Sequence, residues 1–383
     1  MNVSFRRLMP TSAAVLLAAT AWVAHGQTLD SSSAIDVTLR SDSTHLSGAD
    51  DVTVDVTITN LGAVPVFVPK WYVPSQTPSS AVFAITRNGE PVPYLGAIVK
   101  RKAPSARDFV RIAAGASLSY KVELSALYDL SATGVYSIQY DVPSMPTFRG
   151  TALNAATIER AAQSQSGPQT QDLVSNAITL SIAGDAAAEA RRAANLAARA
   201  SAPVAPAFVE PVGFVGCSNT RSSEIRTAVT SAESYASNAL SYLDADTRGP
   251  RYTTWFGTYT ASRYSTVRNH FSSISDAVSH QSLEFDCSTC PGTPYADAFA
   301  YVQTNQPYRI YLCSAFWAAP NAGTDSRAGT IIHELSHFTV VAGTNDYAYG
   351  QSAASTLART RPSRAVRNAD NHEYFSENTP AQN

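Results

Sequence analysis

Charge is scarce in this chain, and lysine is scarcer still. Charged residues make up 15% of its 383 residues, and the formal net charge is −2. A nearly neutral chain gives no electrostatic reason to expect binding to nucleic acid, so we expect no nucleic-acid partner. Disordered chains are poorer in apolar residues than this one, which has 44%, and they are richer in charge. The composition therefore indicates folded domains, and the length suggests about two or three of them.

Long apolar runs are absent after residue 26. The one run near the start, Ala13–Val23, follows two arginines and precedes small residues at positions 24 and 26. This arrangement is typical of a secretory signal, whereas a membrane span needs ~20 apolar residues. We therefore predict a signal peptide over residues 1–26. The protein is then expected to be secreted, either extracellular or in transit through the periplasm, with no membrane span once the signal is removed.

Cysteine is absent from the first half of the chain. The four cysteines are Cys217, Cys287, Cys290 and Cys313. An even number in an exported protein predicts two disulfides. Cys287 and Cys290 form a CxxC pattern, which also occurs in zinc and redox sites, but a second such pair is missing. We therefore expect structural disulfides.

Residues 27–183 show the pattern of a β-rich domain. Apolar and polar residues alternate with period two in several short segments, which indicates half-buried strands. These segments are Val52–Thr59, Ala81–Thr86, Ser117–Leu124 and Val135–Tyr140. Turn residues such as Asn88-Gly89 separate them. We predict an all-β, sandwich-like N-terminal domain that carries no catalytic motif, followed by an Ala-, Arg- and Pro-rich linker over residues 184–212.

Residues 213–383 are expected to be mainly α-helical. Two apolar stripes recur at helical spacing, which predicts two core-facing helices. The first stripe is Ile225, Val229, Ala232, Tyr235, Ala236, Ala239 and Tyr242, and the second is Tyr264, Val267, Phe271, Ile274 and Val278. Tyr308–Phe316 is predicted to be a strand.

The segment from His333 to His337 reads His-Glu-Leu-Ser-His, an HExxH motif. Residues four apart lie on one face of a helix, so both imidazoles can reach one metal ion. Glu334, next to the first histidine, can act on a metal-bound water. The alternative is a structural helix with two surface histidines. The apolar flanks of the motif favour the metal site.

A third ligand is needed because catalytic zinc usually takes three protein ligands and one water. Asp346 lies nine residues after His337, within the segment Gly343–Gly350. Gly343 can end the helix and turn the chain back, so that Asp346 completes a His-His-Asp set. Tyr349 could point its phenol at the developing oxyanion.

The HExxH motif followed by GTxDxxYG resembles the signature of the aspzincins, the deuterolysin family of zinc metalloendopeptidases. Asn368–Phe375 resembles the corresponding segment of the peptidyl-Lys metalloendopeptidase branch, whose members cut on the amino side of lysine. The resemblance covers about residues 213–383. It implies a zincin-type catalytic domain with a small β-sheet, and the N-terminal region looks like the pro-region of bacterial relatives.

This resemblance assigns roles to individual residues. It implies one Zn²⁺ per catalytic domain, bound by His333, His337 and Asp346. Glu334 then matches the general base, and Tyr349 matches the oxyanion-stabilising tyrosine.

The resemblance also implies a lysine pocket and a disulfide pairing. Asp370 and Glu373 match the acidic residues that receive the substrate lysine. His372, between them, is expected to be structural or solvent-facing. The implied disulfides are Cys217–Cys287 and Cys290–Cys313.

The sequence therefore predicts a secreted zinc endopeptidase that cuts before lysine. Its partners would be protein or peptide substrates with an accessible lysine and its own pro-domain, and we expect a monomer. Two alternatives stay open. One is a broad-specificity deuterolysin-like protease. The other is an exported binding protein whose zinc is structural, although no fourth protein ligand is evident.

All lysines lie in the predicted N-terminal domain, at Lys70, Lys100, Lys102 and Lys121. A lysine-directed protease would find no site in its own catalytic domain. The polar stretch Lys100–Asp108 is predicted to be an exposed loop that is easily nicked. Self-cleavage is therefore expected near Lys100 or Lys121, and any cut in the linker should need another protease or relaxed specificity.

Overall fold

The computed structural model describes residues 35–48, 50–74, 80–163, 170–184, 187, 190 and 212–383. The predicted signal peptide and most of the predicted linker lie outside these residues. Within the described part of the chain, no helix is long and apolar enough to cross a membrane.

The N-terminal region is built mainly of β-strands, as predicted, and all its pairs are antiparallel except β2 with β13 among the described residues. One sheet has the order β1-β3-β9, from β1 (Ile35–Arg40), β3 (Thr53–Asn60) and β9 (Ser117–Glu123). Buried and partly exposed residues alternate along β3 because one face of this sheet covers the core. The predicted strands are thus confirmed, and β10 (Gly134–Pro146) is longer than predicted.

Two further sheets complete this region. The larger has the order β2-β13-β10-β5-β6, with β12 paired to β10, and the smaller has the order β11-β4-β8. Their strands are β2 (His45–Ser47), β13 (Ile178–Ala183), β5 (Phe83–Arg87), β6 (Glu90–Pro91), β12 (Thr170–Val174), β11 (Phe148–Arg149), β4 (Val66–Pro69) and β8 (Phe109–Ile112). Short helical segments are η1 (Lys70–Tyr72), η2 (Ala106–Asp108) and α1 (Ala155–Gln163).

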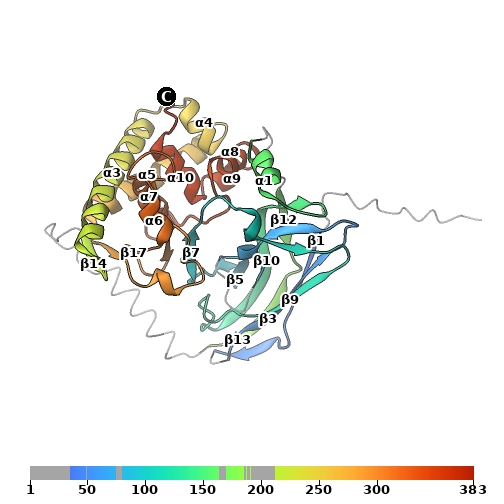
Figure 1. The fold of residues 1–383 in the computed structure, drawn as a ribbon. Helices are drawn as coiled ribbons and strands as arrows, with labels where there is room; N and C mark the ends of the chain where they lie inside the picture. Colours follow the sequence, from blue (N-terminus) through green and yellow to red (C-terminus); the bar gives the residue numbers. More distant parts are fainter. Residues whose placement is uncertain are drawn as a thin grey trace, which may run out of the picture. The chain divides into compact units, whose positions relative to one another are not determined.

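The C-terminal region is mainly helical, also as predicted (Figure 1). Its helices are α3 (Asn219–Asp244), α4 (Pro250–Phe256), α5 (Ala261–His280), α6 (Ser314–Ala318), α7 (Arg327–His337), α8 (Gln351–Thr360), α9 (Pro362–Ala365) and α10 (Ala369–Glu377), with η3 at Cys290–Gly292. The predicted strand over Tyr308–Phe316 is correct for β17 (Arg309–Leu312) but wrong beyond it, where α6 begins. A short apolar run does not distinguish strand from helix by periodicity.

A five-stranded sheet lies beside these helices in the order β14-β15-β17-β16-β7. The strands β14 (Val212–Val215), β15 (Leu283–Asp286) and β17 run parallel, and β16 (Ala300–Gln303) runs antiparallel to β17. The fifth strand, β7 (Ala97–Lys100), comes from the N-terminal region and pairs antiparallel with β16. The sequence pattern did not predict this pairing between the two halves of the chain.

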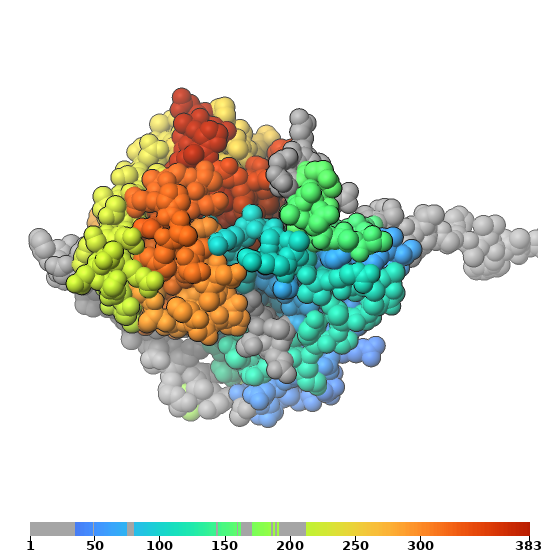
Figure 2. Space-filling model, in the orientation of Figure 1, coloured from blue at the N-terminus to red at the C-terminus, as the bar shows by residue number. Residues whose placement is uncertain are grey.

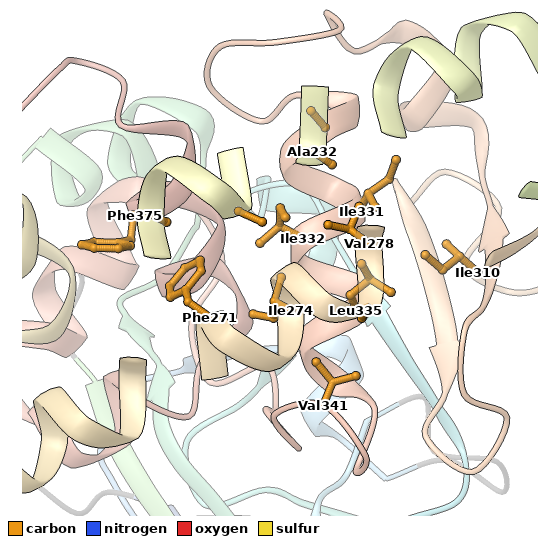
Figure 3. Close-up of a cluster of buried hydrophobic side chains, with 14 of the residues drawn as sticks. Ala232, Phe271, Ile274, Val278, Ile310, Ile331, Ile332, Leu335, Val341 and Phe375 are labelled. Atoms are coloured by element: carbon orange, nitrogen blue, oxygen red, sulfur yellow. The ribbon is translucent and has the colours of Figure 1, made fainter. Parts of the chain in front are cut away.

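The helical core forms around α7. Figure 3 shows Ile274 and Val278 of α5 beside Ile331 and Leu335 of α7. The Phe271 ring of α5 lies 5.2 Å from the Phe375 ring, between centroids. Ala232 of α3 and Phe375 of α10 belong to the same buried cluster. Both predicted apolar stripes thus face the core. Every residue of α7 from Ala328 to His337 is buried, so packing on all sides fixes the position of the HExxH motif.

Two disulfides fasten the sheet, with the pairing that the resemblance implied. Cys217 is bonded to Cys287 and joins the chain after β14 to the chain after β15. Cys290 is bonded to Cys313 at the end of β17. The second pair packs against Val99 of β7 and Tyr301 of β16, so this disulfide lies directly under the junction of the two halves.

Core packing around α7 gives a first prediction. Phe271→Ala should lower the free energy of unfolding by about 3–5 kcal/mol because it empties a fully buried site. Val340→Ala is the control, since Val340 is 61% exposed and its loss should change stability by less than about 0.5 kcal/mol. Urea unfolding followed by tryptophan fluorescence measures both. Equal effects of the two changes would show that α5 does not support this core.

Candidate functional site

Helix α7 presents His333 and His337 on one side, with ring centroids 4.8 Å apart. Ser326 caps the N-terminus of this helix, and its hydroxyl accepts a hydrogen bond from the backbone N–H of Gly329 at 2.9 Å. Glu377 of α10 accepts hydrogen bonds from the backbone N–H and the hydroxyl of Ser326, at 2.9 and 2.8 Å. A Cβ at position 329 would lie 2.1 Å from the Glu377 carboxylate, so a larger residue there would push this carboxylate away from Ser326. Close packing of α10 on α7 therefore sets the site.

Asp346 reaches the two histidines from the loop after α7. Its Oδ1 lies 3.2 Å from Nε2 of His333 and 3.5 Å from Nε2 of His337. These three atoms are buried and have no hydrogen-bond partner among the described residues. Buried polar atoms that converge without partners are costly unless something binds them. The three residues form a group that could hold a metal ion.

Backbone hydrogen bonds hold the loop that carries Asp346. Helix α7 already ends at His337, earlier than Gly343, and Gly343 lies in the following turn with φ at +59°. The backbone N–H of Thr344 donates to the carbonyl of Ser336 at 3.0 Å, and that of Asn345 donates to the carbonyl of Arg367 at 2.8 Å. The expected return of the chain towards the histidines is present, although the glycine does not end the helix itself.

Hydrogen bonding orients the His337 ring. Its Nδ1 lies 3.0 Å from the carbonyl oxygen of Thr344. A carbonyl only accepts, so Nδ1 carries the proton and Nε2 offers its lone pair towards Asp346. Burial lowers the pKa of His337 to about 4. Burial raises the pKa of Asp346, but the two histidines outweigh it and bring that pKa to about 2. A neutral imidazole beside a carboxylate is the state that binds a divalent metal.

The other nitrogen of His333 faces two carboxylates of α10. Its Nδ1 lies 2.9 Å from Oδ1 of Asp370 and 3.3 Å from Oε2 of Glu373. Asp370 also accepts a hydrogen bond from the backbone N–H of Gly350 at 2.6 Å. A carboxylate behind a metal-binding histidine fixes its ring and raises its basicity. Asp370 and Glu373 are therefore placed to support His333 as well as to receive a cation.

Glu334 is fully buried. Neither of its carboxylate oxygens has a hydrogen-bond partner among the described residues. Burial raises its pKa to about 8, with the negative charges of Asp346 and Glu373 acting in the same direction and His333 and Lys100 opposing them. A carboxyl group in this environment can hold and release a proton near neutral pH.

The phenol of Tyr349 points towards Asp346 and the C-terminal end of β7. Its hydroxyl oxygen lies 3.1 Å from Oδ2 of Asp346 and 3.1 Å from the carbonyl oxygen of Val99 in β7. The guanidinium of Arg101 donates to this hydroxyl at 3.0 Å. Tyr349 thus touches both a candidate metal ligand and a peptide carbonyl.

The sequence did not predict that Lys100 is buried beside the carboxylates of α10. Its side chain is only 1% exposed, so the prediction of an exposed loop at this residue is wrong, although Lys102 is exposed. The Lys100 ammonium lies 2.5 Å from Oε2 of Glu373 and 3.8 Å from Oδ1 of Asp370. It also lies 3.9 Å from Asp325 and 4.8 Å from the centroid of the Phe299 ring.

The environment of Lys100 keeps its side chain charged. Burial alone would lower its pKa, but Glu373, Asp370 and Asp325 raise the pKa above the ordinary value. The only local signal for burial is that the apolar run Ala97–Val99 leads directly into it. Asp325 and Phe299, which help to surround the ammonium, had no sequence signal.

His372 lies outside the metal-binding group. Its Nδ1 is 2.9 Å from the carbonyl oxygen of Asn368, and its Nε2 is 3.0 Å from Nδ1 of His270. Burial lowers its pKa to about 3. This fully buried imidazole therefore has structural partners on both sides, as expected.

Similarity to known proteins identifies the family. Residues 241–377 match the family model described as lysine-specific metallo-endopeptidase. The chain is 44% identical over 336 residues to an extracellular protease of Aeromonas hydrophila, with 87% of this chain and 90% of that protein covered. It is 39% identical over 348 residues to a peptidyl-Lys metalloendopeptidase of Grifola frondosa, with 88% and 91% covered.

This chain belongs to the aspzincin family. It is therefore a zinc metalloendopeptidase. A solved zinc peptidase from Grifola frondosa is similar over 44% of this aspzincin and 100% of that chain, with 52% identity and a TM-score of 0.41. The family implies a zinc cofactor, and the two imidazole nitrogens and one carboxylate oxygen without partners fit it, because zinc binds nitrogen and oxygen ligands of this kind.

The unpartnered atoms lead to a prediction about zinc content. Replacing His333, His337 or Asp346 by Ala should each reduce bound zinc from one equivalent to a small fraction, because each change removes a ligand. His280→Ala is the matched control, since His280 is exposed and pairs only with Asp276 in the described structure. Elemental analysis after dialysis measures the zinc. Full zinc in Asp346→Ala would contradict the ligand set.

Proposed function

We propose that this aspzincin hydrolyses peptide bonds on the amino side of lysine, using one zinc ion held by His333, His337 and Asp346. One observation carries the proposal. The chain's own Lys100 inserts its ammonium between the carboxylates of α10, and the carbonyl before it accepts from Tyr349. A substrate cut before lysine needs its side chain and scissile carbonyl in these two places.

The pocket supports lysine by charge and by size. An ammonium is strongly hydrated, so a site that removes its water must supply anionic acceptors. Glu373 and Asp370 are buried and supply them, and the Phe299 ring adds a cation–π contact. An apolar side chain would leave these carboxylates buried and unpaired, which argues against the broad-specificity alternative. The broader, planar guanidinium of arginine does not match a pocket filled by an ammonium.

The chain's own residues can carry the proton and hold the developing charge. Bound zinc supplies a Lewis acid for the substrate carbonyl and lowers the pKa of water. Glu334 takes the proton from the attacking water and passes it to the leaving amine. Tyr349 donates to the oxygen that becomes negative, at the position that the Val99 carbonyl occupies. Asp370 keeps His333 oriented through Nδ1.

The role of Glu334 can be separated from zinc binding. Glu334→Gln should keep one equivalent of zinc and lower kcat by about 10²–10⁴ or more, since it removes the proton carrier and no ligand. Glu90→Gln, an exposed change in the N-terminal region, is the control. Zinc analysis and cleavage of a quenched lysine peptide measure both quantities. Activity within a factor of about two of the parent would exclude Glu334 as the proton carrier.

The pocket residues lead to a prediction about specificity. Glu373→Gln should reduce the preference for lysine over arginine by about 10-fold or more, because it weakens a charge-assisted contact. Asp370→Asn should lower kcat as well, because Asp370 also faces His333. The control is Asp276→Asn on α5, whose carboxylate is exposed. Values of kcat/KM for matched Lys, Arg and Leu peptides test this, and equal cutting of the Lys and Leu peptides by the parent would contradict the pocket.

A further inference from the structure

Strand β7 is the edge strand of the five-stranded sheet and pairs with β16. Bound peptides add to the edge of a sheet in the same way. The pairing of β7 with β16 is antiparallel, with Val99 opposite Tyr301 and Lys100 opposite Ala300. The backbone N–H of Phe299 donates to the carbonyl of Lys100 at 2.9 Å. Main-chain hydrogen bonds of this kind do not depend on the sequence of the bound strand, so selectivity for lysine must come from the pocket of Asp370 and Glu373. The bond between Val99 and Lys100 is thereby presented to the catalytic groups.

The chain on both sides of this bond contacts residues around the catalytic groups, and we call the space that it occupies there the cleft. Val99 is fully buried against the Cys290–Cys313 disulfide. The Arg101 guanidinium lies 5.9 Å from the centroid of the Tyr349 ring in the C-terminal region. Ala103 and Pro104 then line an apolar cavity of about 160 Å³ that faces residues of α8. In Figure 2 the teal atoms of this part of the chain lie directly against the orange atoms of the C-terminal region.

Contacts away from the cleft hold β7 in place. Asp172 in β12 pairs with Arg361 and with Arg364, the latter at 3.1 Å. Thr304, just after β16, donates its hydroxyl to the carbonyl of Tyr94 at 2.7 Å. Tethered segments act at effective concentrations in the millimolar range. A free peptide would therefore compete poorly for the edge of β16 and for the acidic pocket.

We propose that the N-terminal region inhibits the protease by occupying its cleft as an internal substrate, and that Val99–Lys100 is the bond cut in self-processing. The proposal rests on the proposed lysine specificity. In the cut, water adds its oxygen to the carbonyl carbon of Val99, the C–N bond to Lys100 breaks, and a proton passes to the Lys100 nitrogen. The products are a carboxylate on Val99 and an amino group on Lys100.

The structure selects Lys100 over the other lysines. Lys121 is exposed on β9 and pairs with Asp42 and Asp55, at 3.0 and 3.6 Å. Lys70 and Lys102 are exposed as well. Among the four lysines, only Lys100 enters the pocket of Asp370 and Glu373. The sequence alone left two candidate self-cleavage sites, Lys100 and Lys121, and the structure favours Lys100.

Chemical labelling of lysines tests whether Lys100 occupies the acidic pocket, and it does not require an active enzyme. The full-length, metal-free Glu334→Gln protein is treated with formaldehyde and cyanoborohydride, and each lysine is followed by mass spectrometry. Lys100 should react at least about tenfold more slowly than Lys102, because it must first leave the pocket. Glu373→Gln in the same background should remove much of this protection, whereas Asp276→Asn should not. Equal reaction of Lys100 and Lys102 in the Glu334→Gln protein would overturn the proposal.

Peptide binding tests the inhibition. The probe is a fluorescent acetyl-Ala-Val-Lys-Ala-amide peptide, and the protein is the zinc-loaded Glu334→Gln chain. Lys100→Gln and Lys100→Met in this background should each bind the probe at least about tenfold more tightly than the background protein, because the pocket is vacated. Lys102→Gln is the matched control and should leave the affinity unchanged. Melting curves verify that all variants are folded. Equal affinity in all of them would overturn the inhibition.

Self-processing is read from new N-termini in the zinc-loaded parent. A fragment starting at Lys100 is expected, and it should disappear in Lys100→Gln but persist in Lys102→Gln and Lys121→Gln. A first cut elsewhere would overturn the assigned bond. If added peptides are cut before lysine while Val99–Lys100 stays intact, the inference fails and the proposed function stands. If neither the parent nor Lys100→Gln cuts any lysine peptide, the proposed function fails. The labelling of Lys100 still measures whether its side chain occupies the acidic pocket.

Discussion

The site depends on the burial of several carboxylates around one imidazole. Glu334, Asp346, Asp370 and Glu373 share a small volume with His333, and their side chains are almost completely inaccessible to water. Removing an uncompensated charge from water costs several kcal/mol, so such a cluster needs cations. One is the metal ion that His333, His337 and Asp346 can bind. The other is the ammonium of a lysine, which the chain itself supplies through Lys100.

This constraint links the scaffold to the chemistry. α10 carries Asp370 and Glu373, and its Glu377 accepts hydrogen bonds from the backbone N–H and the hydroxyl of Ser326, the N-cap of α7. The missing side chain at Gly329 lets the two helices approach closely. The two candidate metal-binding histidines and the carboxylates of the proposed lysine pocket are therefore held by the same pair of helices, α7 and α10. A shift of α10 would disturb both the orientation of His333 and the recognition of the substrate.

Much of this arrangement can be read from the sequence, because it is local. The four-residue spacing of HExxH places both histidines on one face, and the helical stripes around Val229 and Phe271 identify the core. Four strands of the N-terminal region, β3, β5, β9 and the first part of β10, follow from their alternation. The end of the strand after Tyr308 was wrong because an apolar run of that length fits helix and strand equally.

The role of Lys100 could not be read locally. Its neighbours Arg101 and Lys102 make the stretch look like a solvent-exposed loop. Its burial depends on pairing between β7 and β16, which lie in different halves of the chain, and on carboxylates of α10 that local sequence cannot place beside it. Asp325 and Phe299 were missed for the same reason. Tertiary contacts, and not the polarity of the neighbouring residues, therefore determine that Lys100 is buried.

The most direct test of the account is a peptide map of a denatured, unrelated protein digested by the zinc-loaded enzyme. The acidic pocket predicts that new N-termini are almost entirely lysine, with few at arginine. New N-termini spread over leucine, phenylalanine and other apolar residues would contradict the central claim that buried carboxylates select the substrate.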